Sequence, residues 1–261
     1  MSSLINYDYH VHANIMNVPE DADKYVLRAM TLGLDEICIT DHAPYAHLSG
    51  RDRIPADGMT EYIERVRALA DKYSGKIGIK CGMEIDYIPA FERQIEQMLS
   101  CGKLDYVLGS SHLHIRGMTE KPLCEYTAHE YVGLCYENNL RAVKSGYFQT
   151  ISHIDMYRWV ISCKERFKLI GEEYDLSCYT DMIREIFSEM EKRGVSLEIN
   201  THLIGNGDVE KVYPAAELMS IAKEYRLTYR FGSDAHTPNC VGDGIAEITS
   251  SPIYAHCWRK I

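Results

Sequence analysis

One pattern of apolar and polar positions recurs along the chain. A stretch with apolar residues at helical spacing is followed by a glycine or a short turn, then by a short apolar run, and then by a group of polar residues. Helical stretches that alternate with short apolar runs are typical of βα units in a parallel sheet. We predict seven strands: one that opens near Tyr7, and others at 37–40, 76–86, 106–109, 148–151, 195–199 and just before Asp234.

The ends of these predicted elements indicate how they are arranged. Gly33, Gly102, Gly146 and Gly194 each follow a helical stretch, where the left-handed conformation that ends many helices favours glycine. Each predicted strand finishes in residues that can bind a metal or form hydrogen bonds. Functional groups of βα barrels lie at the C-terminal ends of the strands, whereas an open sheet gathers its ligands at one switch point. The pattern therefore predicts an α/β protein with a single domain over residues 1–261, a distorted (β/α)7 TIM-like barrel with its site at the C-terminal mouth of the strands.

Histidines are concentrated at these strand ends. Asp8, His10 and His12 alternate along the first strand, so we expect them to share one face. Of eleven histidines, seven lie at or just after a predicted strand end: His10, His12, His42, His112, His114, His153 and His236. Imidazole together with carboxylate is the ligand mixture of Zn, Fe and Mn sites. Glu84 lies among apolar residues, where an unpaired carboxylate would be costly and a metal would remove that cost. Asp234 is two residues from a histidine, so both can enter one site.

Several other polar residues have more than one interpretation. Asp41 could be a metal ligand, a partner that orients a histidine, or a helix cap, and we favour the second of these. His114 could be a ligand or a spare histidine near the mouth. Asn200 and His202 follow Glu198 at two-residue steps, which makes both candidates for contact with a substrate.

Composition narrows the possible partners and the compartment. The formal charge of −10 argues against a nucleic-acid surface, because binding to phosphate backbones needs a basic field. No apolar run approaches the ~20 residues that a membrane span needs, and the N-terminal segment lacks the layout of a signal peptide. Nine scattered cysteines without a CxxC pair indicate reduced thiols. We therefore expect a cytoplasmic protein with a small-molecule substrate and no membrane or nucleic-acid partner, and the sequence leaves the oligomeric state open.

Seven short motifs, taken in order, resemble those of a known family. They are DYHVH, ITDHAP, GMEIDY, VLGSSH, ISHID, LEINT and GSDAH, and they extend from about residue 5 to residue 240. This set resembles the polymerase-and-histidinol-phosphatase (PHP) superfamily. More narrowly, TDHAP, GMEIDYI and LDYVLGSSH look like its monofunctional histidinol-phosphatase branch. The resemblance implies a seven-stranded barrel that carries three divalent transition-metal ions (Zn, Fe or Mn) at its C-terminal mouth.

The resemblance also implies which residues hold the metals. One ion is expected at His10, His12, Glu84 and Asp234, a second at Glu84, His112 and His153, and a third at His42 and His236. Glu84 would then bridge two ions. Relatives often supply another ligand soon after the HxH motif, but this chain has no histidine there. We expect either that Glu20 or Asp21 substitutes at the third site or that this ion is weakly bound.

The implied reaction is hydrolysis of a phosphate monoester, for which clustered metals supply a hydroxide and bind the phosphoryl oxygens. The leading expectation is conversion of L-histidinol phosphate and water to L-histidinol and phosphate, a step of histidine biosynthesis. The alternatives are another phosphate ester, such as a nucleotide or phosphotyrosine, and a non-catalytic metal-binding barrel. The residues expected to serve the substrate are Arg158 and Arg116 as phosphate-binding arginines, Asn200 and His202 as substrate contacts, and Asp41 or Asp155 in proton transfer.

Overall fold

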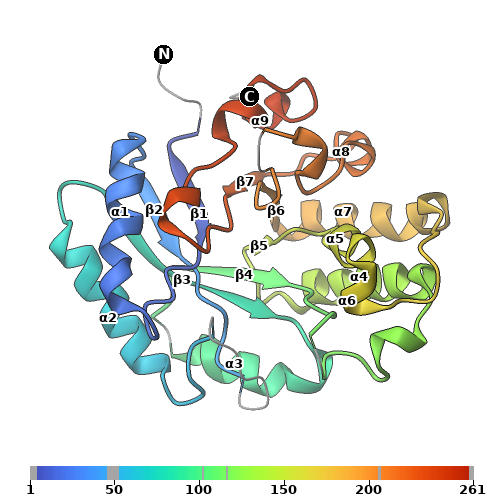
Figure 1. Ribbon diagram of the computed structural model, residues 1–261, viewed down its shortest axis with the longest axis horizontal. Helices are drawn as coiled ribbons and strands as arrows, with labels where there is room; N and C mark the ends of the chain where they lie inside the picture. Colours follow the sequence, from blue (N-terminus) through green and yellow to red (C-terminus); the bar gives the residue numbers. More distant parts are fainter. Residues whose placement is uncertain (1–4, 46–52, 102, 116, 205–206, 259–261) are drawn as a thin grey trace.

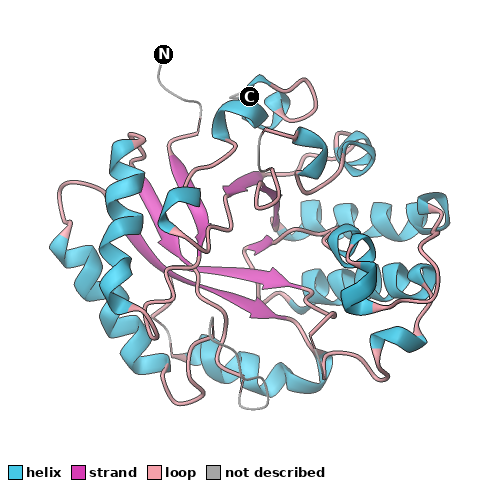
Figure 2. Cartoon of the chain, viewed as in Figure 1, coloured by secondary structure: helices cyan, strands magenta, loops and turns pink. Residues whose placement is uncertain are grey.

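Seven parallel strands form the centre of the computed structural model, which describes residues 5–45, 53–101, 103–115, 117–204 and 207–258. The strands neighbour one another in chain order, and the helices lie outside them (Figures 1 and 2). The strands are β1 (Tyr7–Val11), β2 (Glu36–Ile39), β3 (Gly78–Asp86), β4 (Tyr106–Ser110), β5 (Thr150–Ile151), β6 (Ser196–Asn200) and β7 (Tyr229–Gly232). This order confirms the predicted seven-stranded α/β barrel.

The helices follow the strands as the periodic pattern predicts. They are α1 (Ala22–Thr31), α2 (Met59–Lys72), α3 (Glu92–Ser100), α4 (Ala128–Ser145), α5 (Tyr157–Ser162), α6 (Lys164–Phe167), α7 (Thr180–Arg193), α8 (Ala216–Ala222) and α9 (Ile245–Ser250). Gly146 and Gly194 end α4 and α7 at φ 76° and 69°, a left-handed conformation that a Cβ would oppose. Gly33 has φ 73° just beyond α1. The fourth predicted glycine, Gly102, lies outside the described residues.

β5 is shorter than the strand predicted at 148–151. The side-chain Oε1 of Gln149 accepts a hydrogen bond from the backbone N–H of Val107 (2.8 Å), so this N–H is not available to a longer backbone ladder. Regular pairing with β4 therefore begins at Thr150, which lies opposite Leu108.

The segment after β7 closes the barrel against the end of β1. Val11 pairs with Ala235 as an isolated parallel bridge, and the backbone N–H of His12 donates to the carbonyl of Ala235 (2.9 Å). Figure 1 shows β1 and β7 next to each other at this seam. The seam brings the end of the last strand beside the first two histidines.

Asp8 stabilises the same seam between β1 and the segment after β7. Its side chain does not lie with those of His10 and His12, in contrast to the expectation from alternation. Its carboxylate accepts hydrogen bonds from the backbone N–H of Ser233 (3.0 Å) and of Gly242 (2.9 Å). The register of β1 shifts between Asp8 and Val11, and this irregularity breaks the simple two-residue alternation. Asp8 is therefore a structural residue.

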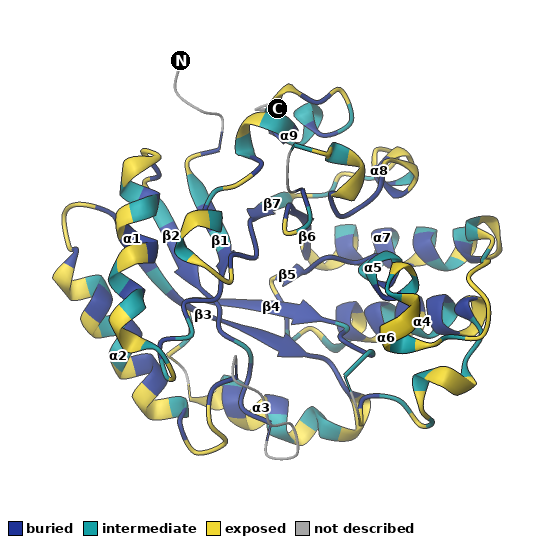
Figure 3. Ribbon diagram, in the orientation of Figure 1, coloured by how far each residue is buried: buried dark blue, intermediate teal, exposed yellow. Residues whose placement is uncertain are grey.

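Burial follows the barrel architecture. The strands and the inward faces of the surrounding helices are buried, whereas the outer helix faces are exposed (Figure 3). Within the described ranges, no helix is long and apolar enough to cross a membrane. Buried polar residues are concentrated at the C-terminal ends of the strands, where His10, Glu84 and His153 are each less than 5% exposed.

Gly232 on β7 provides the space in which two of these polar residues meet. A Cβ at this position would lie 2.1 Å from Oε1 of Glu198 and 2.6 Å from Cβ of His10. We predict that Gly232→Ala destabilises the protein by about 1–3 kcal/mol, the usual cost of overpacking a core. Chemical denaturation would measure this loss. Gly133→Ala in α4 is the control, and equal stability of the two variants would contradict the prediction.

Candidate metal centre

The eight predicted metal ligands lie together at the mouth of the barrel. They come from the ends of six strands: His10 and His12 from β1, His42 from β2, Glu84 from β3, His112 from β4, His153 from β5, and Asp234 and His236 from β7. Parallel strands bring their C-terminal ends to one rim, which is why residues far apart in the chain meet here.

His10 and His12 face Asp234 across the seam between β1 and β7. Their Nε2 atoms are 3.0 Å apart, and Nε2 of His12 is 3.2 Å from Oδ1 of Asp234. Oε2 of Glu84 lies 3.5 Å from Nε2 of His10 and 3.4 Å from Nε2 of His12. One ligand atom from each of His10, His12 and Asp234 lies within 4.8 Å of the other two. These distances suit one metal ion.

Glu84 is the centre of the group. Its Oε1 lies 2.9 Å from Nε2 of His153 and 3.7 Å from Nε2 of His112, and its Oε2 lies 2.8 Å from Nδ1 of His42. The backbone that follows β2 holds His42 next to Glu84, because Ala43 donates its backbone N–H to the carbonyl of Glu84 (2.9 Å). The two carboxylate oxygens therefore face different histidines, as a bridging ligand requires.

The donor set fits a metal centre. Oε2 of Glu84 and Nδ1 of His42 are both buried and close to each other, but neither forms a hydrogen bond. Burial opposes ionisation of Glu84, but the imidazoles of His112, His10 and His42 hold the pKa of its carboxyl well below the usual range. An ionised carboxylate surrounded by imidazole nitrogens is the coordination chemistry of Zn, Fe or Mn.

Two carboxylates that the sequence analysis did not select hold the histidines in place. Oε1 of Glu198 accepts a hydrogen bond from Nδ1 of His10 (2.6 Å), and Oδ1 of Asp86 is 2.7 Å from Nδ1 of His112. A carboxylate accepts the Nδ1 proton, so Nε2 is the nitrogen of each ring that is left to bind a metal. Strand parity could have found Asp86, because it lies two residues after Glu84 on β3 and therefore on the same face.

The third predicted site has more candidate ligands near it than the expected pair of His42 and His236. Within the described residues, His236 groups with His12 and His42, and also with His202 and Asp234. Glu20 is exposed, and Asp21 forms an ion pair with Lys24 beside α1. The structure thus places neither of the two expected substitutes at the third site.

Asp41 organises the backbone after His12. Its two carboxylate oxygens accept hydrogen bonds from the backbone N–H of Asn14 (2.8 Å) and of Ile15 (2.9 Å). Burial raises the pKa of Asp41 to about 6, and these two hydrogen bonds oppose the shift. Both oxygens thus hold the loop after His12, and the roles expected for Asp41 in proton transfer and in orienting a histidine stay predictions.

Arg158 and Asp155, the expected phosphate-binding arginine and proton donor, form an ion pair with each other. Nε of Arg158 is 3.1 Å from Oδ2 of Asp155, and its two terminal nitrogens donate to the carbonyls of Glu210 (3.1 Å) and Val212 (2.7 Å). The guanidinium also lies over the ring of Tyr213. These contacts fasten the segment that carries Tyr213 to α5, and they leave Arg158 outside the lining of the pocket.

Asn200 is likewise structural in this arrangement. It is fully buried, and its side-chain amide donates to Oε2 of Glu198 (3.0 Å) and to Oδ2 of Asp234 (3.3 Å). Its Oδ1 accepts the backbone N–H of His202 (2.9 Å). Asn200 therefore orients two carboxylates and one histidine of the centre. The remaining predicted contact, Arg116, lies outside the described residues.

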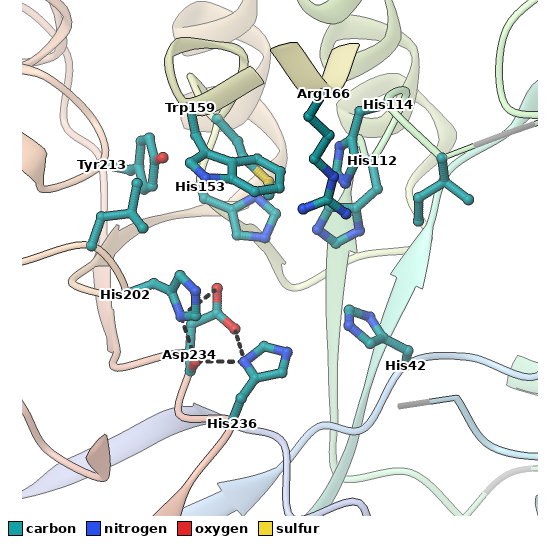
Figure 4. A pocket seen from close by; sticks show the side chains of 13 residues that line it. His42, His112, His114, His153, Trp159, Arg166, His202, Tyr213, Asp234 and His236 are labelled. Atoms are coloured by element: carbon teal, nitrogen blue, oxygen red, sulfur yellow. Dashed lines mark hydrogen bonds and ion pairs between the residues drawn. The ribbon is translucent and has the colours of Figure 1, made fainter. Parts of the chain in front are cut away.

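A pocket of about 350 Å³ opens above the metal-ligand candidates (Figure 4). Four histidines and one aspartate of the candidate set line its base, whereas Met156, Trp159, Leu203 and Tyr213 line its walls. Arg166 of α6 points into the pocket beside Trp159, with its guanidinium carbon 5.2 Å from the ring centre. The sequence analysis did not select Arg166, because it lies on a helical turn that does not follow a strand directly.

Fold and site together define a parallel α/β barrel with a histidine- and carboxylate-rich metal centre at its mouth. The model of the PHP domain family matches residues 8–202, and the chain belongs to this family. It is 27% identical over 252 residues to the probable histidinol-phosphatase of Deinococcus radiodurans, which covers 92% of both chains. It is 27% identical over 241 residues to the histidinol-phosphatase of Bacillus subtilis, covering 84% of this chain and 88% of the relative.

A solved structure supports the same fold. The histidinol phosphate phosphatase of Lactococcus lactis subsp. lactis, crystallised with zinc, L-histidinol and phosphate, superposes with a TM-score of 0.76 at 22% identity. The match covers 97% of this chain and 93% of that chain. The likeness extends over nearly the whole chain.

We predict that Glu198→Gln weakens metal binding roughly 10–100-fold, the usual loss when the partner of a metal-bound histidine is changed. An amide can still accept from Nδ1 of His10, but its NH₂ would then face the N–H of His153, which donates to Oε2 of Glu198 (2.8 Å). Titration of metal-free protein with zinc measures the affinity. Glu217→Gln on the exposed side of α8 is the matched control, and equal affinity of both variants would refute this role of Glu198.

Proposed function

We propose that the protein is a metal-dependent phosphomonoesterase that hydrolyses L-histidinol phosphate to L-histidinol and phosphate. The observation that carries this proposal is the arrangement around Glu84, where one buried carboxylate faces three histidines below an open pocket. Relatives that match over most of the chain are named for the same reaction. The clustered donors also disfavour a non-catalytic barrel, because such a protein has no need of several groups of metal-binding side chains beneath a pocket.

The centre would hold up to three divalent ions of Zn, Fe or Mn in this proposal. His10, His12, Asp234 and Glu84 would hold one ion, Glu84 with His112 and His153 a second, and His42 with His236 a third. Bound metal ions lower the pKa of water and neutralise phosphoryl oxygens in phosphate-ester hydrolysis. The chain supplies the geometry, because Glu198 and Asp86 fix two of the imidazoles before any ligand arrives.

The side chains above the base of the pocket would bind and orient the substrate. Arg166 is the described cation that lines the pocket, so it is our candidate for a contact with the phosphoryl group. Burial and the nearby His112 lower the pKa of His114 to about 3, so its imidazole is neutral near pH 7 and offers one N–H donor and one acceptor nitrogen to a substrate. Trp159, Met156 and Tyr213 offer aromatic and apolar surface to the leaving group.

One observation favours a larger phosphate ester as the second candidate substrate. The pocket shares His42, His114 and Arg166 with a wider groove of about 1150 Å³, which also carries Lys121 and Lys168. This groove has room for a bulky or anionic leaving group, such as that of a nucleotide or a phosphopeptide. The net charge of −10 still disfavours long nucleic acids.

The compartment that we propose is the cytoplasm. All nine cysteines are free thiols in the structure, which agrees with a reducing environment.

We predict that the protein loaded with Zn, Mn or Fe hydrolyses histidinol phosphate with a higher kcat/KM than a nucleoside monophosphate, phosphotyrosine or p-nitrophenyl phosphate. Phosphate release measures each rate. Glu84→Gln should abolish activity on all four while the barrel stays folded by circular dichroism, because an amide has only one coordinating oxygen and no charge. Retention of more than about a tenth of kcat, a loss below ~1.4 kcal/mol, would refute the bridging role. A preference for another ester would replace histidinol phosphate as the substrate.

Two arginines allow the phosphate contact to be located. We expect Arg166→Gln to weaken inhibition by inorganic phosphate and to raise KM, by roughly 10–150-fold for a charge-assisted hydrogen bond of ~1.5–3 kcal/mol. Arg158→Gln should instead lower the melting temperature, because it leaves the buried carboxylate of Asp155 without its ion-pair partner. If phosphate inhibition is lost in the Arg158 variant and kept in the Arg166 variant, the clamp lies at Arg158 after all.

A further inference from the structure

We propose that His202 is a metal ligand that completes the third metal site together with His236 and Asp234. The inference rests on the proposed metal-dependent function, because it assigns a residue to one of its ions. One ligand atom from each of these three residues lies within 4.8 Å of the others. Figure 4 shows the three side chains together on one wall of the pocket, opposite His42.

The hydrogen bonds of the two histidines prepare them for a metal in the same way. Nδ1 of His202 and Nδ1 of His236 are each 2.9 Å from the backbone carbonyl oxygen of Asp234. A carbonyl oxygen can only accept, so Nδ1 carries the proton in both rings and Nε2 of each neutral imidazole keeps a lone pair. Histidines bound to metals commonly donate their other N–H to a backbone carbonyl. His202 therefore has the same supporting contact as the ligand expected at His236.

The backbone conformation of Asp234 allows both histidines to donate a hydrogen bond to its one carbonyl oxygen. Asp234 adopts φ 53°, a left-handed conformation that is uncommon for a residue with a side chain and often marks a functional site. Its Oδ1 lies 3.2 Å from Nε2 of His12, whereas its Oδ2 lies 3.9 Å from Nδ1 of His202. Oδ1 also lies 3.4 Å from Nδ1 of His236, so this carboxylate borders both the first metal site and the two histidines. Asp234 can contribute to both sites.

His202 also resolves the shortage of ligands at the third site. Glu20 and Asp21, the substitutes expected from the sequence, do not reach the pocket lining. His202 belongs to that lining, and its side chain is 39% exposed. An ion held there lies closer to solvent than one at Glu84, which is 1% exposed. It should be the first ion that a chelator removes.

Metal content separates this role from a direct contact between His202 and the substrate. The probe is zinc, added to metal-free full-length protein without substrate, and the measurements are bound zinc per chain and the affinity of each binding step. We expect His202→Ala to lose the weakest binding step or to weaken it roughly 10–100-fold, as His236→Ala should. His202→Asp should restore part of this affinity, because a carboxylate oxygen can replace imidazole as a zinc ligand.

His114→Gln is the matched control, because it changes another pocket histidine that is outside this group of three. It should bind as many zinc ions as the unchanged protein, with the same affinities. If His202→Ala also keeps every binding step unchanged, His202 is not a ligand and the inference is overturned. The inference is equally overturned if the unchanged protein binds no third ion. Since no substrate is present, a protein that binds three ions but hydrolyses no phosphate ester would still support it.

Discussion

The ionised carboxylate of Glu84 at the closed centre of the barrel mouth constrains the rest of the site. Removing such a charge from water costs several kcal/mol, and the attraction of a positive partner must compensate for this cost. The neighbours that the fold provides are imidazoles, and at least one of them meets Glu84 at 2.8 Å without a hydrogen bond. Protonated imidazoles lower the pKa of this carboxyl when no metal is bound. A divalent cation balances the carboxylate in their place, and it also uses the lone pairs that the histidines leave free.

Around Glu84, successive layers of buried polar groups each need partners for their own charges. Glu198 and Asp86 fix His10 and His112, and they are buried charges that need partners of their own. Arg53 supplies one by donating to Oδ2 of Asp86 (2.7 Å). Asn200 supplies another by donating to Glu198. Each layer is satisfied by the next, and only the innermost one retains unused donor atoms. The centre therefore keeps buried donor atoms that a metal ion could use.

The sequence predicts the barrel and the gathering of the candidate ligands at its mouth because both depend on local periodicity. A strand that ends in a histidine is visible in a window of a few residues, and parallel topology brings all such ends to one rim. The roles of Arg158, Asp155 and Asp41 depended instead on loops that fold back over the barrel. The Arg158 guanidinium is bound by carbonyls more than 50 residues away in the chain, and no local pattern indicates such partners. Arg166 was missed for the same reason, because only the packing of α6 brings it to the pocket.

In the proposed function, the strand ends and the loops contact different parts of the substrate. Residues at the strand ends would meet the phosphoryl group, which every phosphate monoester shares. Trp159, Met156 and Tyr213 would meet the leaving group, and they belong to the segments after β5 and β6. Loops can change without disturbing the strands that they connect. The metal centre can therefore stay constant while the pocket wall determines which ester is hydrolysed, so substrate identity has to be sought in the contacts of these three side chains.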